Sequence, residues 1–156
     1  MPDMLVKLYE LPDSSALYRE IADQGIILKR ALAPELHRAT AFAREHFSEA
    51  WASEVACAFV NQPVSCYLAI DQKEIVGFSC VESTCKAFFG PTGVLPAYRG
   101  RKIGHALLML ALEHLRDIGY AYAIIGGAGP VAFYEKSCGA TVIEGSVPGI
   151  YANLQI

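Results

Sequence analysis

The stretch that decides the fold is VLPAYRGRKIGHALL at residues 94–108. Its first half is a turn sequence with proline, glycine and three cations, Arg99, Arg101 and Lys102, and its second half begins a helix. Backbone N–H groups in the first turn of a helix have no intrahelical partner and lie at the positive end of the helix dipole. Together these features predict a site that binds phosphate oxygens.

The neighbours of this turn support the same interpretation. Gly100 and Gly104 have no Cβ, so an anion can come close to the backbone. Residues 103–118 carry apolar side chains at helical spacing, and Gly119 stands where it can end the helix. The apolar positions are Ile103, Leu107, Met109, Leu110, Ala111, Leu112, Leu115 and Ile118. We expect this helix to be buried against a sheet.

The rest of the chain alternates between strand and helix patterns. Strands are predicted over residues 5–8, 26–29, 66–70, 75–81, 87–95, 122–125 and 150–154, and helices over 14–24, from Pro34, over 48–59 and over 130–137. The polar residues 71–74 predict an antiparallel hairpin. Gly90, Pro91 and Gly93 predict a bulge or a splayed edge in the strand that contains them.

Composition favours one globular domain over residues 1–156. The chain is 53% hydrophobic and 19% charged, far from the range of disordered proteins. With 13 basic and 16 acidic residues its net charge is −3, which provides no general attraction for nucleic acid or anionic membranes. No stretch approaches the ~20 apolar residues of a membrane helix, and no signal sequence is visible. We expect a cytoplasmic protein without a nucleic-acid or membrane partner.

The five cysteines predict neither a metal site nor a disulfide framework. They form no CxxC pair, and their number is odd. Cys66 and Cys80 lie among apolar strand residues and are expected to pack as small hydrophobic side chains. For Cys85 and Cys138 a nucleophilic role stays open, although no histidine stands beside either in sequence to activate a thiolate.

The turn resembles the coenzyme A-binding motif of the GNAT superfamily of acetyltransferases. That motif is Gln/Arg-x-x-Gly-x-Gly/Ala, within a longer stretch similar to V-x-P-x-Y-R-G-x-G-I-G-x-A-L-L. The matching residues are Val94, Pro96, Tyr98, Arg99, Gly100, Ile103, Gly104, Ala106, Leu107 and Leu108. Lys102 departs from the pattern, because the family usually has glycine there. We expect helical backbone without a positive φ at Lys102, so that the lysine adds a charge for a phosphate.

The resemblance implies a mixed, mostly antiparallel α/β fold of the α+β type, with helices flanking the sheet and a splayed pair of parallel strands. It implies acetyl-CoA as a co-substrate, without a metal, and pantetheine amides bonded by the backbone near Thr92, Gly93 and Val94. The diphosphate contacts it implies are Arg99, Gly100, Arg101, Lys102, Ile103, Gly104 and His105.

A second region, PVAFYEK at residues 130–136, is similar to a later helix of the family. By position, Tyr134 takes the role of the tyrosine that protonates the departing coenzyme A thiolate, and a phenol is a chemically sensible acid for that step. The alternative is a tyrosine that packs its ring in the core and leaves its hydroxyl at the surface. Gly127 stands where an asparagine is common, and one extra residue precedes Gly139. The resemblance covers residues 66–141.

No general base is evident in the sequence. Glu82, near the end of a predicted strand, is the best carboxylate candidate, and a solvated strand-end charge is the alternative. Glu45 and Glu54 are candidates for the lining of an acceptor cleft. On the helix after the turn, His105 is expected beside the phosphates and His114 at the exposed surface. The closing segment, residues 145–151, borders either the acceptor site or a contact in a homodimer.

Two function classes therefore remain. The first is an N-acetyltransferase that passes an acetyl group from acetyl-CoA directly to the amine of a small molecule or peptide in a ternary complex. The second is a non-catalytic acyl-CoA sensor or interaction domain, which the lack of an evident base favours. A nucleotide-phosphate enzyme is disfavoured, because the turn lacks the GxxxxGK[ST] arrangement.

Overall fold

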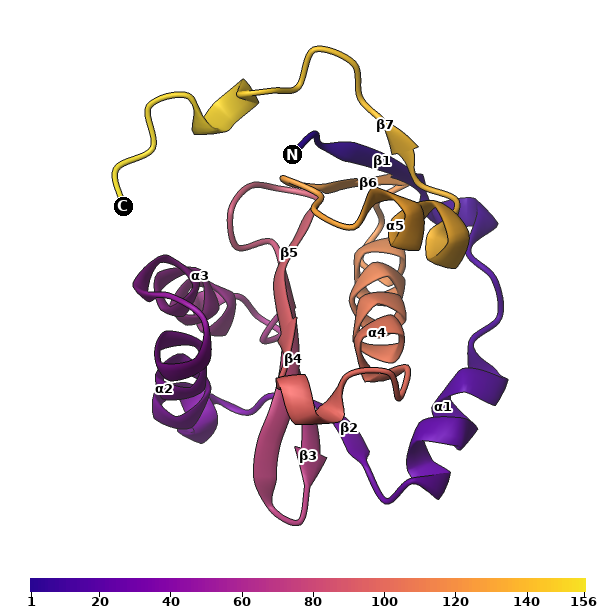
Figure 1. Cartoon of the computed structure of the whole chain (residues 1–156), viewed down its shortest axis with the longest axis vertical. Coiled ribbons are helices and arrows are strands. Elements are labelled where there is room, and N and C mark those ends of the chain that lie inside the picture. The colour runs from indigo at the N-terminus through magenta and orange to yellow at the C-terminus, as the bar shows by residue number, and fades with distance from the viewer.

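A seven-stranded sheet runs through the computed structural model, which describes residues 1–156, in the order β2-β3-β4-β5-β6-β1-β7 (Figure 1). The strands are β1 Met4–Lys7, β2 Ile27–Arg30, β3 Cys66–Asp71, β4 Glu74–Val81, β5 Phe88–Val94, β6 Tyr122–Ile125 and β7 Thr141–Val142. All neighbouring pairs are antiparallel except β5 and β6. The predicted mixed, mostly antiparallel fold with one parallel pair is confirmed.

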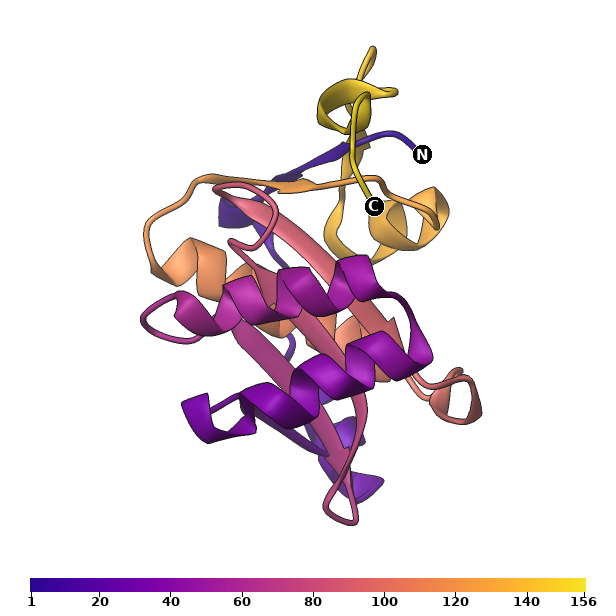
Figure 2. The same ribbon diagram turned by 90° about the vertical axis from the view of Figure 1, so that its left-hand side faces the viewer.

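The helices cover both faces of this sheet. They are α1 Ser15–Asp23, α2 Leu36–His46, α3 Glu49–Val60, α4 Ile103–Asp117 and α5 Val131–Cys138. Helices α2 and α3 lie side by side on one face (Figure 2), whereas α4 packs on the other face with α1 and α5 beside it (Figure 1). None of them is long and apolar enough to cross a membrane.

Strand β3 shows how the sequence divides the core between the two faces. Successive strand residues point to opposite sides of a sheet. Cys66 and Leu68 accordingly pack with α2 and α3, whereas Tyr67 and Ala69 pack with α4. Helix α4 is therefore held on an apolar surface, as its spacing predicts, with Leu112 among its fully buried side chains.

The N-terminal strand β1 lies inside the sheet, between β6 and β7. Met4 is paired with Ile125 on one side and with Val142 on the other. The predicted last strand over residues 150–154 is wrong, since residues 149–151 form a 3₁₀ turn in which Gly149 has a φ of +59°. Residues 143–156, called the C-terminal segment below, instead pass over the end of the sheet toward α3 (Figure 1).

Strands β5 and β6 are paired over a short distance and then diverge. Their only pairs are Phe88 with Ile124 and Phe89 with Ile125, after which β5 continues alongside β4 alone. The β4–β5 register shifts between Ser79 and Val81, opposite Gly90, whose φ is +121°. The predicted bulge and splayed edge are confirmed. The point just after Phe89 and Ile125, where the two strands part, is called the apex below.

Candidate functional site

The turn between β5 and α4 presents a row of unbonded donors. Every backbone N–H from Gly100 to His105 lacks a hydrogen-bond partner in the chain, and the first bonded N–H of α4 is that of Ala106, 3.0 Å from the Lys102 oxygen. Gly100 and Lys102 are both left-handed, with φ of +81° and +66°. Successive free N–H groups in such a backbone form a concave anion-binding nest at the positive end of a helix. This nest is called the phosphate turn below.

Lys102 does not have the helical backbone expected from the sequence. With φ of +66° and ψ of +13° it is the left-handed residue that turns the chain into α4, a conformation that costs a non-glycine residue about 1 kcal/mol. Its ammonium group is paired with Glu20 of α1, with 3.1 Å between Nζ and Oε2. The lysine charge therefore points toward α1, and the family's usual glycine is explained by the positive φ.

Two exposed arginines border the phosphate turn. Arg99 Nε donates to the Val94 oxygen at 3.2 Å, and the Arg101 guanidinium lies over the Tyr98 ring, 4.8 Å from its centroid. Tyr98 is anchored in turn, because its hydroxyl donates to Asp71 Oδ2 at 2.7 Å. Neither arginine is paired with a carboxylate. Both cations are thus available to an anion on the turn.

His105 connects the phosphate turn to α5. Its ring packs edge-on against Phe133, with 6.1 Å between the ring centroids. Burial and then the charge of Lys102 lower the pKa of His105. The imidazole is therefore neutral near pH 7, where it can bond an anion only through a ring N–H.

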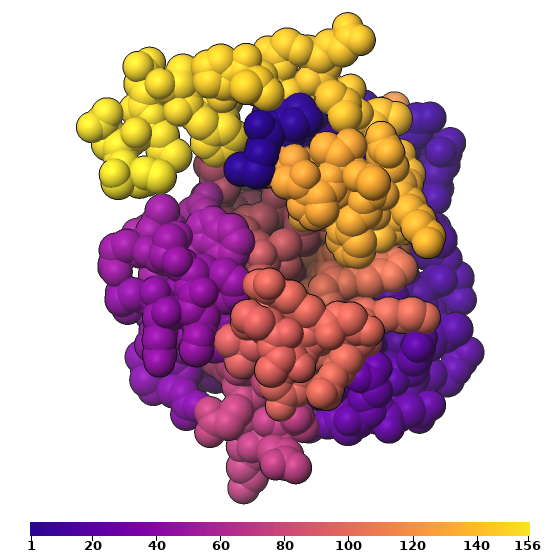
Figure 3. All heavy atoms as spheres, viewed as in Figure 1, coloured from indigo at the N-terminus to yellow at the C-terminus, as the bar shows by residue number.

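Strand β5 leads from the phosphate turn to the apex through the residues expected at the pantetheine. Thr92 Oγ1 donates to the Phe78 oxygen at 3.0 Å and thereby fixes β5 to β4. A Cβ on Gly93 would overlap the Phe47 ring, so the glycine lets that ring pack on the strand. Figure 3 shows the surface hollowed between α3, the phosphate turn and α5, with β5 at the floor.

Tyr134 lies at the apex end of this hollow. It is 6% exposed, and its ring centroid is 6.2 Å from that of Phe89, the last paired residue of β5. Its hydroxyl makes no hydrogen bond within the chain, yet it is not enclosed, since the only enclosed polar side-chain groups without a partner are those of Tyr18 and Ser83. Burial raises the pKa of Tyr134 to about 12. The phenol is therefore protonated near pH 7 and open to a ligand.

Two of the three candidate carboxylates, those of Glu82 and Glu54, are hydrogen-bonded within the chain. Glu82 follows β4 with a φ of +59°, and its Oε2 accepts the Ala87 N–H at 3.0 Å, which closes the β4–β5 loop. Glu54 of α3 accepts from Thr84 Oγ1 at 2.5 Å. Glu45 is exposed on α2. No hydrogen bond joins any of the three to Tyr134.

His114 is buried, at 5% exposure, so its expected surface position is wrong. Its Nδ1 lies 2.9 Å from Arg30 Nη1 and 3.0 Å from Tyr67 Oη. Since arginine only donates, Nδ1 accepts and the ring is neutral. Burial, followed by the charge of Arg30, lowers the pKa of His114. The helical spacing from Leu107 and Ala111 already assigned this position to the apolar face and could have predicted its burial.

The cysteines lie largely as the sequence indicated. Cys66 and Cys80 are buried in the core beneath α2 and α3, whereas Cys57 and Cys85 are exposed. Cys138 is buried, and its thiol donates to the Tyr134 oxygen at 3.2 Å. Burial raises the pKa of Cys138 to about 11. No group of three potential metal ligands is present.

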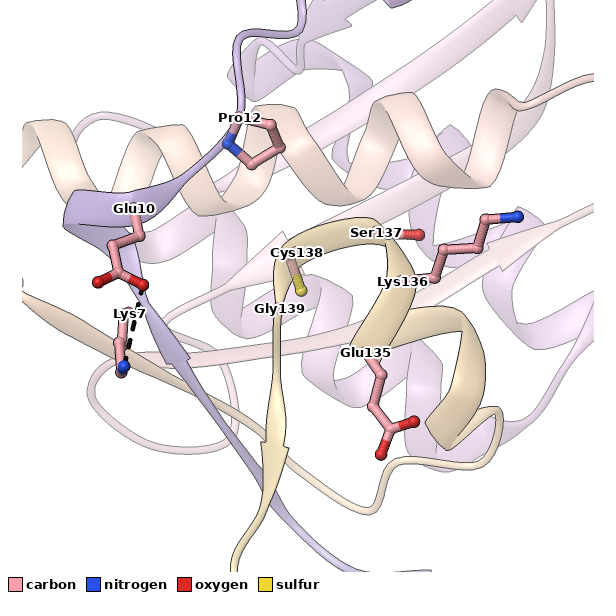
Figure 4. A pocket seen from close by; sticks show the side chains of 8 residues that line it. All are labelled: Lys7, Glu10, Pro12, Glu135, Lys136, Ser137, Cys138 and Gly139. Carbon is pink, nitrogen blue, oxygen red and sulfur yellow. Dashed lines mark ion pairs between the residues drawn. The ribbon is translucent and has the colours of Figure 1, made fainter.

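A separate polar cavity of about 190 Å³ lies at the C-terminal end of α5 (Figure 4). It is lined by Lys7, Glu10, Pro12, Glu135, Lys136, Ser137, Cys138 and Gly139. Lys7 and Glu10 are 3.9 Å apart within it. The end of a helix carries the negative pole of its dipole, which disfavours phosphate. The diphosphate is therefore better matched by the N-terminal end of α4.

Comparison with known proteins identifies a family and a fold for this chain. The family model described as the acetyltransferase (GNAT) family matches residues 30–140. No curated protein matches the chain in sequence. The fold is similar to the GCN5-related glucosamine N-acetyltransferase region of a fungal multi-domain β-N-acetylglucosaminidase, with a TM-score of 0.74 at 14% identity over 91% of this chain and 19% of that one.

Two further solved structures share the fold. A GCN5-related N-acetyltransferase from Sphaerobacter thermophilus has a TM-score of 0.68 at 20% identity, over 91% of this chain and 48% of that one. A GNAT family acetyltransferase from Brucella melitensis, in complex with acetyl-CoA, has a TM-score of 0.56 at 16% identity, over 71% of this chain and 80% of that one. The chain spans between a fifth and a half of the length of the first structures it matches. Because the family model covers most of the chain and the splayed sheet agrees with it, the chain belongs to the acetyltransferase (GNAT) family.

Proposed function

We propose that this chain is an N-acetyltransferase that passes an acetyl group from acetyl-CoA to the amine of a small molecule or peptide. The observation that carries the proposal is the run of unbonded backbone N–H groups from Gly100 to His105, which lies at one end of a hollow that leads to the apex. A diphosphate matches such donors, and Arg99 and Arg101 add mobile positive charge beside them. Arg99, Arg101 and the N–H groups would hold the diphosphate.

Beyond the turn, an extended pantetheine arm would follow β5 at Thr92, Gly93 and Val94. This edge of β5 has no partner strand past Phe89, so its backbone groups can bond amides as a neighbouring strand would. The thioester would then lie at the apex beside Tyr134. The Lys102 charge contributes little to the proposal, since Glu20 already pairs with it.

The reaction assigned to this site is direct transfer in a ternary complex. A neutral amine attacks the thioester carbon, a C–N bond forms, the C–S bond breaks, and the sulfur leaves with the electron pair. Tyr134 donates its proton to that sulfur, and burial raises the proton affinity of phenol and thiolate alike. Most of the rate enhancement would come from holding amine and thioester in position.

The attacking amine must also lose a proton, and Glu82 remains the proposed base. Its Oε2 accepts the Ala87 N–H, and its Oε1 would take the proton of the amine through a water. Glu82→Gln should lower kcat most at low pH, where fewer amine molecules are neutral. Glu54→Gln is the comparison, because Glu54 is expected only to line the acceptor cleft. A Glu82→Gln variant with normal kcat across the pH range would remove Glu82 from the mechanism.

The direct test combines binding with turnover. Calorimetry should show acetyl-CoA binding that ATP does not compete away, and thiol release should depend on an added amine. The panel would include polyamines, amino sugars, amino acids, aminoglycosides and N-terminal peptides. Amino sugars are included because a similar structure is named for glucosamine N-acetylation. Absence of acetyl-CoA binding would refute the proposal.

The alternative is a non-catalytic acyl-CoA sensor or interaction domain. The observation that favours it is that no residue stands out as the general base, since the best candidate, Glu82, already accepts the Ala87 N–H. Under this alternative acetyl-CoA binds with a normal calorimetric signal, but no amine in the panel promotes thiol release.

A further inference from the structure

The C-terminal segment brings a second tyrosine to the apex. Gly126 is the first residue of the β6 chain after its last pair with β5. A Cβ on Gly126 would overlap the Tyr151 hydroxyl oxygen and would lie 3.0 Å from the Phe88 ring. The missing side chain of Gly126 therefore leaves the space that the Tyr151 hydroxyl occupies, beside the point where β5 and β6 part.

This position is fixed by contacts between distant parts of the chain. Asp3, just before β1, donates its N–H to Ser146 Oγ at 2.9 Å and accepts the Ile143 N–H at its backbone oxygen, also at 2.9 Å. Its Oδ1 accepts the Gly127 N–H at 2.8 Å. Asp3 thus ties the beginning of the C-terminal segment to the loop that follows β6. Tyr151 comes from a segment anchored at the apex.

Tyr134 and Tyr151 approach the apex from opposite faces of the sheet. Phe88 and Phe89 are consecutive strand residues, so their side chains point to opposite sides. Phe89 meets Tyr134 in the core beneath α4, whereas Phe88 lies against Gly126 and Tyr151. Figure 1 shows the C-terminal segment reaching toward α3, away from α4 and α5.

The Tyr151 hydroxyl is available to a ligand. It makes no hydrogen bond within the chain, and it is not among the enclosed polar groups without a partner. Burial, followed by the negative charges of Asp3 and Glu54, raises the pKa of Tyr151 to about 12. The hydroxyl is therefore protonated near pH 7 and can both donate and accept a hydrogen bond.

Charge on this face indicates which amines fit. The Asp3 carboxylate lies beside this site, because its Oδ1 accepts the N–H of Gly127, the residue after Gly126, and its Oδ2 would lie 3.9 Å from a Cβ on Gly149. Glu54 adds a second negative charge that contributes to the raised pKa of Tyr151, and the C-terminal segment contains no lysine or arginine. A negative field favours an amine whose own net charge is positive or zero and disfavours one that carries a carboxylate or phosphate.

From this geometry we propose that the Tyr151 hydroxyl hydrogen-bonds the acceptor amine on the face of the sheet opposite Tyr134, and that this face selects amines without acidic groups. The inference rests on the proposed acetyltransferase function and extends it to the acceptor. Tyr151 is then a specificity-determining residue supplied by the C-terminal segment, while the phosphate turn and Tyr134 serve the acetyl donor.

The test is Tyr151→Phe, which keeps the ring in place and removes only the hydroxyl. Acetyl-CoA affinity is measured by calorimetry, and thiol release is measured against the concentration of the best amine of the panel. We expect the KM of the amine to rise about tenfold, the loss of one hydrogen bond, with kcat and acetyl-CoA affinity close to wild type. Tyr9→Phe is the matched control, because Tyr9 is exposed and its hydroxyl bonds only Tyr122.

The charge component is tested by pairing each amino acid with its amide. Wild type should have the higher kcat/KM for the amide, and the ratio of the two kcat/KM values should be smaller in Glu54→Gln. Three results overturn the inference: an unchanged amine KM in Tyr151→Phe, a loss of acetyl-CoA affinity in that variant, or a preference of wild type for free amino acids. In each case wild-type turnover would leave the proposed function standing. If acetyl-CoA does not bind to wild type, or binds without turnover of any amine, the proposed function fails first and the assignment of Tyr151 fails with it.

Discussion

The phosphate turn and the C-terminal segment are built from opposite kinds of contact. In the turn, the Arg99 to Val94 bond and the left-handed residues Gly100 and Lys102 are local in sequence. In the C-terminal segment, the bond from Asp3 to Ser146 spans 143 residues, and Tyr151 meets Gly126. A local contact leaves a short motif that can be read in the sequence, whereas a long-range contact leaves none.

The largest effect is expected from placing a charge in the phosphate turn. Gly104→Glu should lower acetyl-CoA affinity at least about 100-fold, because the carboxylate occupies the anion nest and repels phosphate. The fold should persist, since an acidic residue in the first turn of a helix is favourable and a Cβ there meets only Val94 Cγ2, at 3.7 Å. Calorimetry measures the affinity, and Gly104→Ala is the control for bulk alone. Retained binding in Gly104→Glu would mean that the donor site is elsewhere.

The next effect separates the two tyrosines of the apex. Tyr134→Phe should lower kcat about 100-fold, within the usual range for loss of a general acid, and leave acetyl-CoA affinity unchanged. Tyr151→Phe should change the KM of the amine instead. Steady-state kinetics with both substrates varied gives the two parameters. If both variants change the same kinetic parameter, Tyr134 and Tyr151 do not serve the acetyl donor and the acceptor separately.

A third prediction concerns stability on the α4 face. His114 has a lowered pKa in the folded protein, so its contribution is present above its unfolded pKa of about 6.5 and is lost as the pH falls below that value. The unfolding free energy should fall between about pH 7.5 and pH 5.5, by at most about 1.4 kcal/mol per pH unit from this group. Urea unfolding at both pH values measures it. His114→Gln keeps an acceptor for Arg30 but does not titrate, so its unfolding free energy should fall less between the two pH values. An identical fall in the variant and in wild type would exclude His114 as the source.

The smallest effect is expected at Lys102. Lys102→Gly should raise the unfolding free energy by about 1 kcal/mol, because glycine adopts a positive φ without steric cost. Acetyl-CoA affinity should change by less than about tenfold, or ~1.4 kcal/mol, since the lysine charge is already paired with Glu20. Lys102→Ala is the control, as it removes the charge and keeps the strain. A larger gain in affinity would mark the phosphate turn as a degraded site and favour the sensor alternative.

Sequence reasoning succeeded where a pattern has a local cause. The helical spacing of α4 and the bulge at Gly90 both follow from residues close to them in the chain. The motif match likewise identified the turn. It did not identify the conformation of Lys102, because a helical and a left-handed backbone are both compatible with a lysine before a helix.

The remaining errors concern tertiary contacts. The helical spacing could have predicted the burial of His114, but not its partners, Arg30 and Tyr67, which come from strands far away in sequence. Residues 150–154 were expected to form a strand, but β7 is the last strand at that edge of the sheet and residues 149–151 form a 3₁₀ turn. Nothing near Tyr151 in sequence indicates that its hydroxyl would lie against Gly126.

The interior position of β1 has a consequence for the order in which the protein can form. Its partners are β6, which ends at Ile125, and β7, which ends at Val142. Strand β1 therefore stays unpaired during synthesis until β6 has been made, and closing so long a loop is entropically slow. Until then the apolar side chains of Met4 and Val6 remain open to other contacts, and aggregation through this strand competes with folding.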